Sequence, residues 1–474
     1  MIMNKLSRTI TVAAWLLGAG LARATSFTPC EDAASDAALA SSLCAREEVP
    51  GDPSGLAGAP AKPVSLFVRK FPAQGVARGQ VWLVAGGPGE SGAAFYGMLP
   101  TLRGAFPGFD LLMPDHRGTG FSTRMCPAEE SPGSPGGTAL DGVEWGTCFA
   151  YLNAHPAYTR QFSQTNAAHD LKLLLERTRH QGKTYVYGVS YGTQLVLRTV
   201  AMGAKVDGLV LDSLVPAQDD ASADLSRHSL VADEVGRKLL AGCDRGRCGH
   251  RIGEPIEPLY RRLLARAETE PALLANVPGK NLKRFFGSLF DFPELAARIP
   301  DIIKELDAGQ DAQLKATLAD LQREIERMGR FPQRPPSMPL VILISGSEND
   351  LQPGRTMDAV KQEEAGLLFS SSIPEHLTGR PIPLYERDEW FARLPARLPP
   401  TLVLHGDRDA KTHYGAALRH IEALRKAGPV QLFTDAGGGH FVLWTDHKCS
   451  ADEVKQFVLG DEVKTRCVVI TLSH

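Results

Sequence analysis

The stretch TYVYGVSYGTQLVLRT, residues 184–199, places one serine where a strand-like run meets a helix-like run. Residues 185–189 are mostly aromatic or β-branched, and the residues that follow the serine have a helical pattern. Ser190 stands between them, with Gly188 two positions before it and Gly192 two positions after it. This G-x-S-x-G pattern predicts a tight turn that lifts a nucleophilic hydroxyl out of a sheet. A glycine-rich turn without chemistry is the alternative, and the strand-to-helix context argues against it.

Strand-like and helix-like segments alternate over much of the chain. The segment 166–178 has a helical pattern, with Leu171, Leu174 and Leu175 on one face. The strand-like segments are mostly apolar on both faces, which is typical of a buried parallel sheet with crossover helices. These segments are 64–70, 80–85, 109–114, 185–189, 206–211, 401–405 and 430–433. The sequence therefore predicts an α/β fold with a mostly parallel central sheet.

A mainly helical block, residues 217–395, interrupts this alternation before strands resume near residue 401. Inside the block, an apolar stripe at intervals of three and four residues predicts a helix that packs against the main domain. The stripe consists of Leu314, Leu318, Leu321, Ile325 and Met328. We therefore expect a core domain in two parts, 25–216 and 396–474, with the helical block as an insertion between them.

Composition and charge narrow the classes of function. The chain has 474 residues, of which 43% are apolar and 22% are charged, as is usual for a globular protein. The net charge of -2 gives no support to nucleic-acid binding or to attraction by an anionic membrane surface. We therefore expect no nucleic acid as a partner.

The N-terminus has the pattern of an export signal. Lys5 and Arg8 precede the short apolar run 9–21, and the triplet 22–24 has the small-x-small form of a cleavage site. An uncleaved anchor is the alternative, but the run is shorter than the roughly 20 residues of a spanning helix. We therefore predict a signal peptide over residues 1–24, a secreted or periplasmic protein, and no membrane attachment after cleavage.

The cysteine content agrees with export to an oxidising compartment. The eight cysteines are Cys30, Cys44, Cys126, Cys148, Cys243, Cys248, Cys449 and Cys467. They fall into sequence-adjacent pairs, and we expect them to bond in that way, although eight cysteines permit 105 connectivities. The paired CxxC spacing of a zinc ribbon is missing, so we expect no metal site.

A serine nucleophile needs a base, and the base needs an acid that orients it. His440 follows three glycines in TDAGGGHFVLW, just after the predicted strand 430–433, so its imidazole can reach across the end of the sheet. Asp407 and Asp409 follow the predicted strand 401–405, and Asp409 fits better because it lies further into the loop. Asp212 also follows a strand and is the alternative acid, with the capping of a turn as its structural interpretation.

The reaction also needs hydrogen-bond donors for the oxyanion. The segment WLVAGGPGESG, residues 82–92, runs from a strand into a glycine-rich turn where backbone N–H groups can approach a carbonyl. We expect the backbone N–H groups of Gly87 and Tyr191 to serve as these donors. A phosphate-binding loop is the competing interpretation, and it fails because no Gly-Lys-Ser/Thr follows.

Six motifs in this order resemble the prolyl iminopeptidase and tripeptidyl aminopeptidase family of α/β-hydrolases. They are GGPGESG (86–92), DHRGTGFS (115–122), GVSYGT (188–193), VLDSLVP (210–216), HGDRDAKT (405–412) and GGGHFVL (437–443). The resemblance implies an α/β-hydrolase fold with about eight strands and a helical cap inserted after VLDSLVP. It also implies Ser190 as nucleophile, Asp409 as acid and His440 as base, with no metal or organic cofactor. The implied activity is that of an exopeptidase whose partner is a peptide with a free N-terminus.

Two features depart from the family pattern. Ala85 stands where many prolyl iminopeptidases carry histidine, and Glu90 replaces a residue of the usual glycine run. An aminopeptidase must also bind a protonated amine, for which a carboxylate is the obvious partner. Glu348, in a segment that resembles a substrate-binding part of the family, is the first candidate, and Asp350 and Glu90 follow it. A solvated acidic loop is the alternative interpretation.

Two other functions remain open at the level of sequence. A carboxylesterase would use the same serine, histidine and aspartate, and an unblocked peptide anilide would separate it from a peptidase. A binding module on a retired hydrolase fold would keep the fold without the chemistry. Haloalkane and epoxide hydrolases of this fold use an aspartate at the elbow, so Ser190 argues against them.

Overall fold

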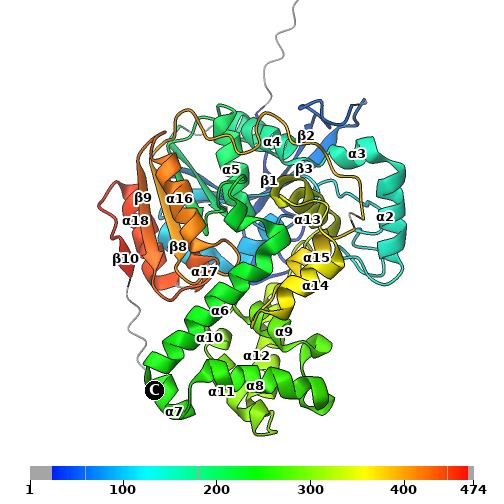
Figure 1. The fold of residues 1–474 in the computed structure, drawn as a ribbon. Helices are drawn as coiled ribbons and strands as arrows, with labels where there is room; N and C mark the ends of the chain where they lie inside the picture. The colour runs from blue at the N-terminus through cyan, green and yellow to red at the C-terminus, as the bar shows by residue number, and fades with distance from the viewer. Residues whose placement is uncertain (1–23, 59, 179–180, 380, 446, 468–474) are drawn as a thin grey trace, which may run out of the picture.

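The fold combines a central sheet flanked by helices with a separate block of helices beside it (Figure 1). The sheet and its helices fill the upper part of that view, and most of the helical block lies below them. The computed structural model describes residues 24–58, 60–178, 181–379, 381–445 and 447–467. All but the last residue of the predicted signal peptide lie outside the described residues, so that assignment stays a prediction.

The sheet of the described chain has ten strands in the order β1-β2-β3-β5-β4-β6-β7-β8-β9-β10. Neighbouring strands run parallel from β5 to β10, whereas β1, β2, β3 and β5 pair antiparallel in that order. The strands are β1 (Thr28–Pro29), β2 (Leu43–Val49), β3 (Val64–Phe71), β4 (Gly79–Val84), β5 (Phe109–Asp115), β6 (Lys183–Val189), β7 (Gly208–Asp212), β8 (Thr401–Gly406), β9 (Val430–Asp435) and β10 (Arg466–Cys467). The predicted mostly parallel sheet is confirmed, and it is wider than the expected eight strands.

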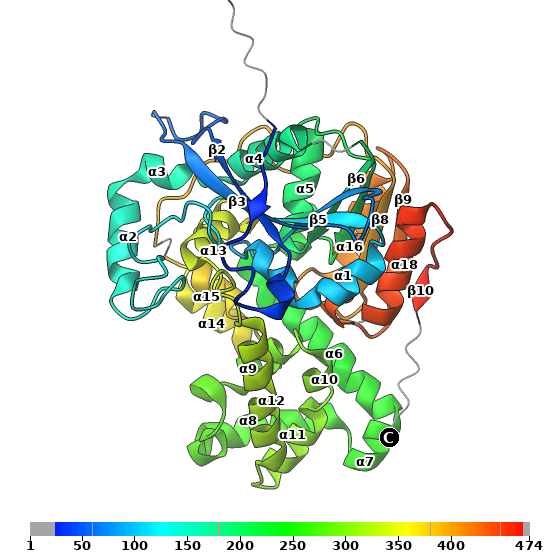
Figure 2. The ribbon, with the colours of Figure 1, turned by 180° about the vertical axis from the view of Figure 1, so that it is seen from behind.

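Helices cover both faces of the sheet. Helices α4, α5 and α16 cover one face and α1 and α18 the other, as the front and back views show (Figure 1 and Figure 2). Trp82 packs in the apolar cluster of the first face, and its neighbours Val81 and Leu83 pack in that of the second. The helices of this part are α1 (Leu99–Ala105), α2 (Glu144–Ala154), α3 (Pro156–Arg160), α4 (Gln164–Arg177), α5 (Tyr191–Ala201), α16 (Tyr414–Leu424), α17 (Val442–Thr445) and α18 (His447–Leu459). Burial on both faces explains why the strands are apolar throughout.

Between β7 and β8 the chain forms the cap, which contains the predicted insertion 217–395. Its core is partly aromatic, because the rings of Tyr260, Phe286 and Phe369 contact one another. The cap helices are α6 (His228–Arg245), α7 (Arg247–Ile252), α8 (Ile256–Thr269), α9 (Leu282–Leu289), α10 (Pro293–Ala296), α11 (Ile299–Asp307), α12 (Ala312–Met328), α13 (Met338–Ile344), α14 (Met357–Ala365) and α15 (Ile373–Leu377). No helix in the described ranges has both the length and the apolarity that membrane crossing requires.

Helix α12 forms where the apolar stripe predicts it, but its packing differs from the prediction. Leu314 is buried and Leu318 and Leu321 are partly buried, all in the cluster of cap residues. Ile325, near the C-terminal end, is 48% exposed. The three leucines therefore pack mainly on cap helices rather than on the main domain, because the cap supplies its own apolar core.

Three disulfides each join two cysteines that follow one another in the order of cysteines along the chain, as the sequence predicts. They are Cys30–Cys44, Cys126–Cys148 and Cys243–Cys248. Cys449 is also disulfide-bonded, and the side chain of Cys467, its predicted partner, lies outside the described residues.

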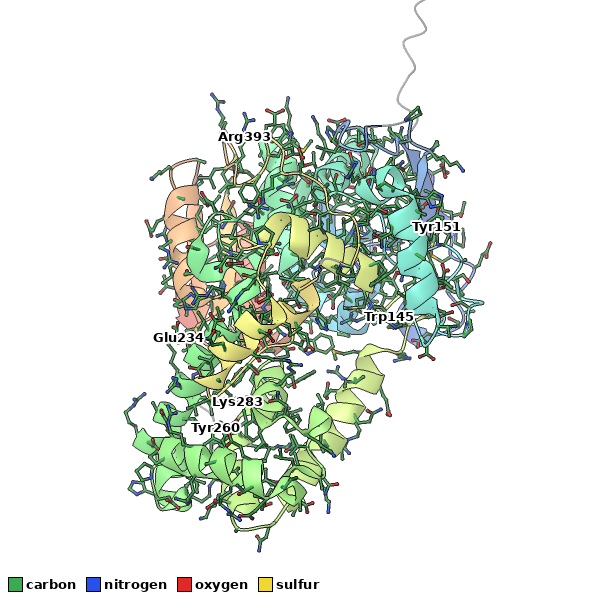
Figure 3. All side chains as sticks on the ribbon, turned by 45° about the vertical axis from the view of Figure 1, so that its right-hand side comes forward. Trp145, Tyr151, Glu234, Tyr260, Lys283 and Arg393 are labelled. Atoms are coloured by element: carbon green, nitrogen blue, oxygen red, sulfur yellow. A yellow bond between two sulfur atoms is a disulfide. The ribbon has the colours of Figure 1, made fainter. Side chains whose placement is uncertain are left out.

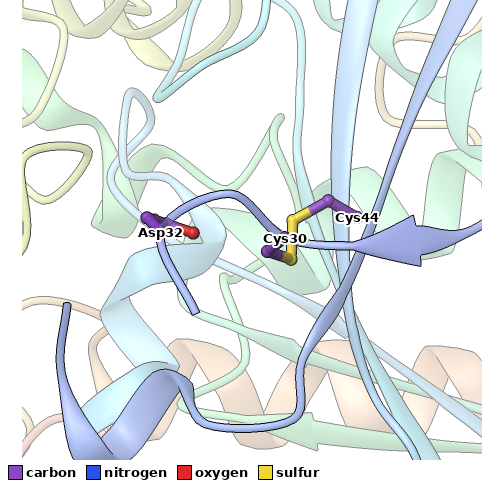
Figure 4. A group of neighbouring side chains, drawn as sticks. All are labelled: Cys30, Asp32 and Cys44. Atoms are coloured by element: carbon purple, nitrogen blue, oxygen red, sulfur yellow. A yellow bond between two sulfur atoms is a disulfide. The ribbon is translucent and has the colours of Figure 1, made fainter. Parts of the chain in front are cut away.

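The side chain of Asp32 lies close to the first of these disulfides (Figure 4). The sulfur atoms of Cys30 and Cys44 are bonded to each other, and the Asp32 carboxylate pairs with Arg69 at 2.7 Å. Metal ions are bound by thiolates rather than by disulfide sulfur. This group of residues is therefore a covalent link beside an ion pair.

Candidate active site

Ser190 occupies the sharp turn between β6 and α5. Its backbone has a φ of 53° and a ψ of -127°, a left-handed conformation that is strained for any residue with a side chain. A Cβ atom at Gly188 would lie 2.7 Å from the Gly192 carbonyl oxygen, and a Cβ at Gly192 would collide with the Val84 carbonyl oxygen. The two glycines are therefore required by the close approach of neighbouring backbone, as the sequence predicts.

A cavity of about 340 Å³, the catalytic cavity, holds Ser190 and His440 in its wall. Core residues such as Gly87 and Tyr191 line it together with cap residues such as Asn349. Since the same cavity receives the predicted nucleophile, base and oxyanion donors, the fold brings together groups that are far apart in the sequence. Within the described part of the chain, no hydrogen bond joins the Ser190 hydroxyl to the imidazole, and such bonds are often long before substrate binds.

Asp409 orients His440. The Oδ2 atom of Asp409 accepts a hydrogen bond from His440 Nδ1 at 2.8 Å, which leaves Nε2 of the ring for a proton from the serine. The loop after β8 fixes the carboxylate, because Oδ1 accepts from the Lys411 and Thr412 N–H groups at 2.7 and 2.8 Å. Asp409 is 1% exposed. This is the geometry that a general base requires from its orienting acid.

The charges of this pair stabilise each other. Burial raises the pKa of Asp409, but the His440 ring and the hydrogen bonds to the carboxylate outweigh burial and hold the pKa well below its ordinary value of 3.8. Burial likewise lowers the pKa of His440, and the Asp409 carboxylate outweighs it, so the pKa lies above 6.5. The imidazole is therefore a stronger base than a free histidine.

The predicted oxyanion donors line the catalytic cavity at Ser190. Tyr191 is the first residue of α5, where backbone N–H groups have no partner within the helix. Gly87 has a φ of 107°, and a Cβ there would lie 2.7 Å from the Gly89 nitrogen, so the turn requires glycine. Gly86 approaches closely as well, since a Cβ there would lie 3.0 Å from Ser190 Cβ. The backbone of this loop therefore lies against the nucleophile.

Asp212, the alternative acid, has a different role. It is fully buried, and its carboxylate accepts hydrogen bonds from the Val442 and Leu443 N–H groups at 2.8 and 2.9 Å. The neighbouring Ser213 Oγ accepts from the Phe441 N–H group at 2.7 Å. The end of β7 thus holds the start of α17, directly after His440. Sequence reasoning missed this role because the three N–H groups lie about 230 residues away.

Glu348, the first candidate for the substrate amine, is engaged elsewhere. It lies in the π-helical turn η7 (Ser345–Asn349) and is 2% exposed. Its two oxygens accept hydrogen bonds from Arg198 of α5, both at 2.8 Å, and further bonds come from Gln218 and Tyr385. All of its accessible lone pairs are therefore used inside the protein, and the assignment as an amine-binding residue does not agree with this arrangement.

The other two candidates lie in different surroundings. Of these described side chains, Glu90 lines the catalytic cavity, and Glu348 and Asp350 do not. Asp350 is 3% exposed and accepts a hydrogen bond from the Gln352 N–H group at 2.9 Å. Glu90 forms an ion pair with Arg334 at 3.0 Å. Among the three, Glu90 is the one that can meet a substrate.

Sequence reasoning missed a second carboxylate in the catalytic cavity. Asp291 lies in the turn between α9 and α10, and it pairs with Lys411 at 3.2 Å. Its charge helps to raise the pKa of His440, so it lies near the imidazole. The segment around Asp291 has no motif that marks chemistry, and only the approach of the cap to the core gives it a role.

Comparisons with known proteins add to this geometry. Residues 81–300 match a family model described as alpha/beta hydrolase fold, and residues 381–467 match one described as TAP-like protein. A search of curated proteins found no match. Similar solved structures include a putative lipase from Acinetobacter baumannii AYE, with 13% identity, coverage of 88% of this chain and 91% of the other, and a TM-score of 0.37. Another is a thermophilic esterase from Thermogutta terrifontis, with 16% identity, coverage of 88% and 98%, and a TM-score of 0.35.

Proposed function

We propose that this chain, which belongs to the α/β-hydrolase family and has a TAP-like C-terminal region, is a serine exopeptidase that acts on peptides with a free N-terminus. The observation that carries the proposal is that a strained Ser190 and His440 line one cavity under the cap, and that a hydrogen bond of 2.8 Å to the buried Asp409 orients the imidazole. The match to the TAP-like model spans Asp409 and His440, and TAP stands for tripeptidyl aminopeptidase. This match therefore supports peptides over other acyl substrates.

The first half of the reaction forms an acyl-enzyme. Ser190 Oγ attacks the scissile carbonyl carbon while His440 Nε2 takes the hydroxyl proton. The Gly87 and Tyr191 N–H groups stabilise the negative oxygen of the tetrahedral intermediate. The C–N bond then breaks, and His440 gives its proton to the leaving nitrogen, which departs as the free amine of the shortened peptide.

The second half regenerates the enzyme. Water enters in place of the amine, His440 takes a proton from it, and the hydroxide attacks the ester carbonyl carbon. The bond to Ser190 Oγ breaks, His440 returns the proton to the serine, and the N-terminal fragment leaves as an acid. Asp409 keeps the imidazole in one tautomer through both halves and stabilises its positive form.

Two carboxylates in the catalytic cavity support recognition of an ammonium group. Glu90 and Asp291 both line it, and each is partly offset by one cation, Arg334 or Lys411. A substrate amine beside either carboxylate would form a charge-assisted hydrogen bond. We therefore assign amine recognition to Glu90 and Asp291 rather than to Glu348.

The test is a panel of peptide anilides that release one, two or three N-terminal residues, each with a free or an acetylated N-terminus. We expect wild-type turnover on at least one free peptide, loss of that turnover on acetylation, and loss of nearly all turnover in Ser190→Ala. A protein that hydrolyses short esters but no free peptide anilide would be a carboxylesterase. Failure of a fluorophosphonate probe to label Ser190 would instead indicate a binding module.

Export completes the proposal. The predicted signal over residues 1–24 and three disulfides in the described chain support a secreted or periplasmic location. Fractionation of cells that express the full chain, followed by N-terminal sequencing of the product, tests it. A cytosolic product that keeps residue 1 would contradict export.

A further inference from the structure

A larger cavity lies next to the catalytic cavity, and the proposed function gives it no role. This second cavity has a volume of about 640 Å³ and is bounded by the cap on one side and the sheet domain on the other. Asp291 lines both cavities. The residues of its wall that matter here are Asp291, Pro293, Asp320, Arg327, Leu443 and Trp444. Its size lies within the range of roughly 300 to 1,000 Å³ that is usual for ligand pockets.

The second cavity lies on the imidazole side of the nucleophile. Leu443 and Trp444 of α17, a few residues after His440, form part of its wall. The cap turn that carries Asp291 packs on the other end of the same loop, because a Cβ at Gly439 would lie 3.2 Å from the Phe290 carbonyl oxygen. The loop that holds the catalytic imidazole is thus flanked on both ends by this cavity's walls.

The chemistry of acyl transfer decides which part of a substrate lies on this side. His440 must deliver a proton to the leaving nitrogen, so the leaving chain has to pass the imidazole. The acyl part remains with Ser190 and the oxyanion donors in the catalytic cavity. We propose that the second cavity binds the peptide segment that follows the scissile bond, so the substrates are oligopeptides extended on that side. This inference rests on the proposed function.

The wall of the second cavity suits a peptide chain. The Arg327 guanidinium lies 4.5 Å from the centre of the Trp444 ring, and its other partner is Glu324 at 2.6 Å. The side chains of both members of that ion pair are more than a third exposed. Arginine can donate to peptide carbonyls or a terminal carboxylate, the acidic groups can accept from N–H groups, and the indole offers a flat apolar surface.

The two volumes also agree with cleavage near the N-terminus. The catalytic cavity, at about 340 Å³, is the smaller of the two, and the second cavity, at about 640 Å³, is the larger. The larger space on the leaving side agrees with a leaving chain that is longer than the acyl fragment. An enzyme for free dipeptides would have no use for the larger space.

The experiment varies only the leaving side. Substrates share one free N-terminal acyl segment, chosen from the anilide panel, and end in p-nitroaniline or in one, two or four further residues. For the wild type we expect kcat/KM to rise about tenfold or more with length. Trp444→Ala and Arg327→Ala should remove most of that gain, so kcat/KM for the longest peptide should fall about tenfold. The kcat/KM for the anilide should stay within about twofold of the wild-type value.

Matched controls come from residues that do not line the second cavity, namely Trp145 in α2 and Arg393 in the segment between α15 and β8, both labelled in Figure 3. Trp145 is 36% exposed, and Arg393 lies 4.6 Å from the Trp390 ring, with a side chain that is 50% exposed against 54% for Arg327. Trp145→Ala and Arg393→Ala should keep the full gain with length. If the wild type gains nothing with length, or if Trp444→Ala lowers turnover of the anilide and the long peptide equally, the leaving-side assignment is wrong and the exopeptidase stands. If the wild type cleaves no peptide or anilide, the proposed function fails and the assignment fails with it.

Discussion

Replacing Glu348 by glutamine should destabilise the protein and leave substrate binding almost unchanged. Glu348 and Arg198 are 2% and 3% exposed, and both of their nitrogen–oxygen distances are 2.8 Å. The substitution removes the negative charge and leaves the Arg198 guanidinium buried without its counter-ion. Breaking a buried ion pair from one side costs about 3–5 kcal/mol, so we expect the free energy of unfolding to fall by about that amount.

Denaturant unfolding at neutral pH measures this loss, with the m-value as a check that the transition itself is unchanged. Glu90→Gln is the control, because the Glu90–Arg334 pair is partly exposed and should contribute less than about 1 kcal/mol. The double variant Glu348→Leu with Arg198→Met should recover most of the stability, since apolar pairs often replace buried ion pairs without loss. An unchanged stability, with a KM that rises for free peptides alone, would refute this reasoning and restore Glu348 as the amine site.

The same pair makes stability depend on pH in a defined direction. Burial raises the pKa of Glu348, but Arg198 and the hydrogen bonds from Gln218 and Tyr385 outweigh it, so the pKa lies below the ordinary value of 4.5. A carboxyl group whose pKa is lower in the folded than in the unfolded state stabilises the fold fully at a pH above its pKa in the unfolded state. This stabilisation is lost as the pH falls through its pKa in the folded state. The stability gap between wild type and Glu348→Gln should therefore be full above about pH 5 and shrink in more acidic solution. A gap that stays constant down to about pH 3 would contradict the ion-pair account.

Two further substitutions test the catalytic base. Asp291→Asn removes a negative charge that raises the pKa of His440, so the acidic limb of the plot of kcat/KM against pH should move to lower pH. An acidic limb that stays in place would show that the two groups do not interact. Asp212→Asn replaces an acceptor of the Leu443 N–H group by an amide, which should displace the His440 loop and lower kcat about 100-fold with little change in KM. Tyr187→Phe, which removes one donor to Asp212 and keeps the carboxylate, should have a much smaller effect, and equal losses in both variants would exclude the proposed role of the carboxylate.

The parts of the fold that the sequence predicts are those with a local cause. The elbow at Ser190 follows from a strand, two glycines and a helix within sixteen residues, and backbone contacts at Gly188 and Gly192 explain both glycines. The sequence predicts Asp409 and His440 from local features, because each lies in a loop just after a strand, and three glycines precede His440. The sequence does not predict strand β2, because the segment LCAREEV carries three charges and lacks the apolar pattern of the buried parallel strands.

The parts that the sequence does not predict depend on partners far along the chain. The sequence predicts Glu348 as a residue that binds the substrate amine, whereas its carboxylate pairs with Arg198, which lies 150 residues away and to which no local pattern points. Asp291 lies at the catalytic cavity only because the cap turn packs against the loop of His440. A carboxylate in a polar segment has the same local appearance whether it is solvated, buried or part of a site.

Helix α5 shows how these two kinds of information combine. Ser190 directly precedes the helix, and Gln194 and Arg198, four residues apart, share one face of it. Gln194 lines the catalytic cavity, and Arg198 binds Glu348 in η7, the same turn that brings Asn349 to the cavity wall. One buried ion pair therefore fixes a wall of the substrate cavity relative to the nucleophile. The separate motifs around Ser190, Asp409 and His440 can each be recognised locally, whereas the position of the cap over the cavity depends on contacts such as this ion pair, which only the tertiary structure reveals.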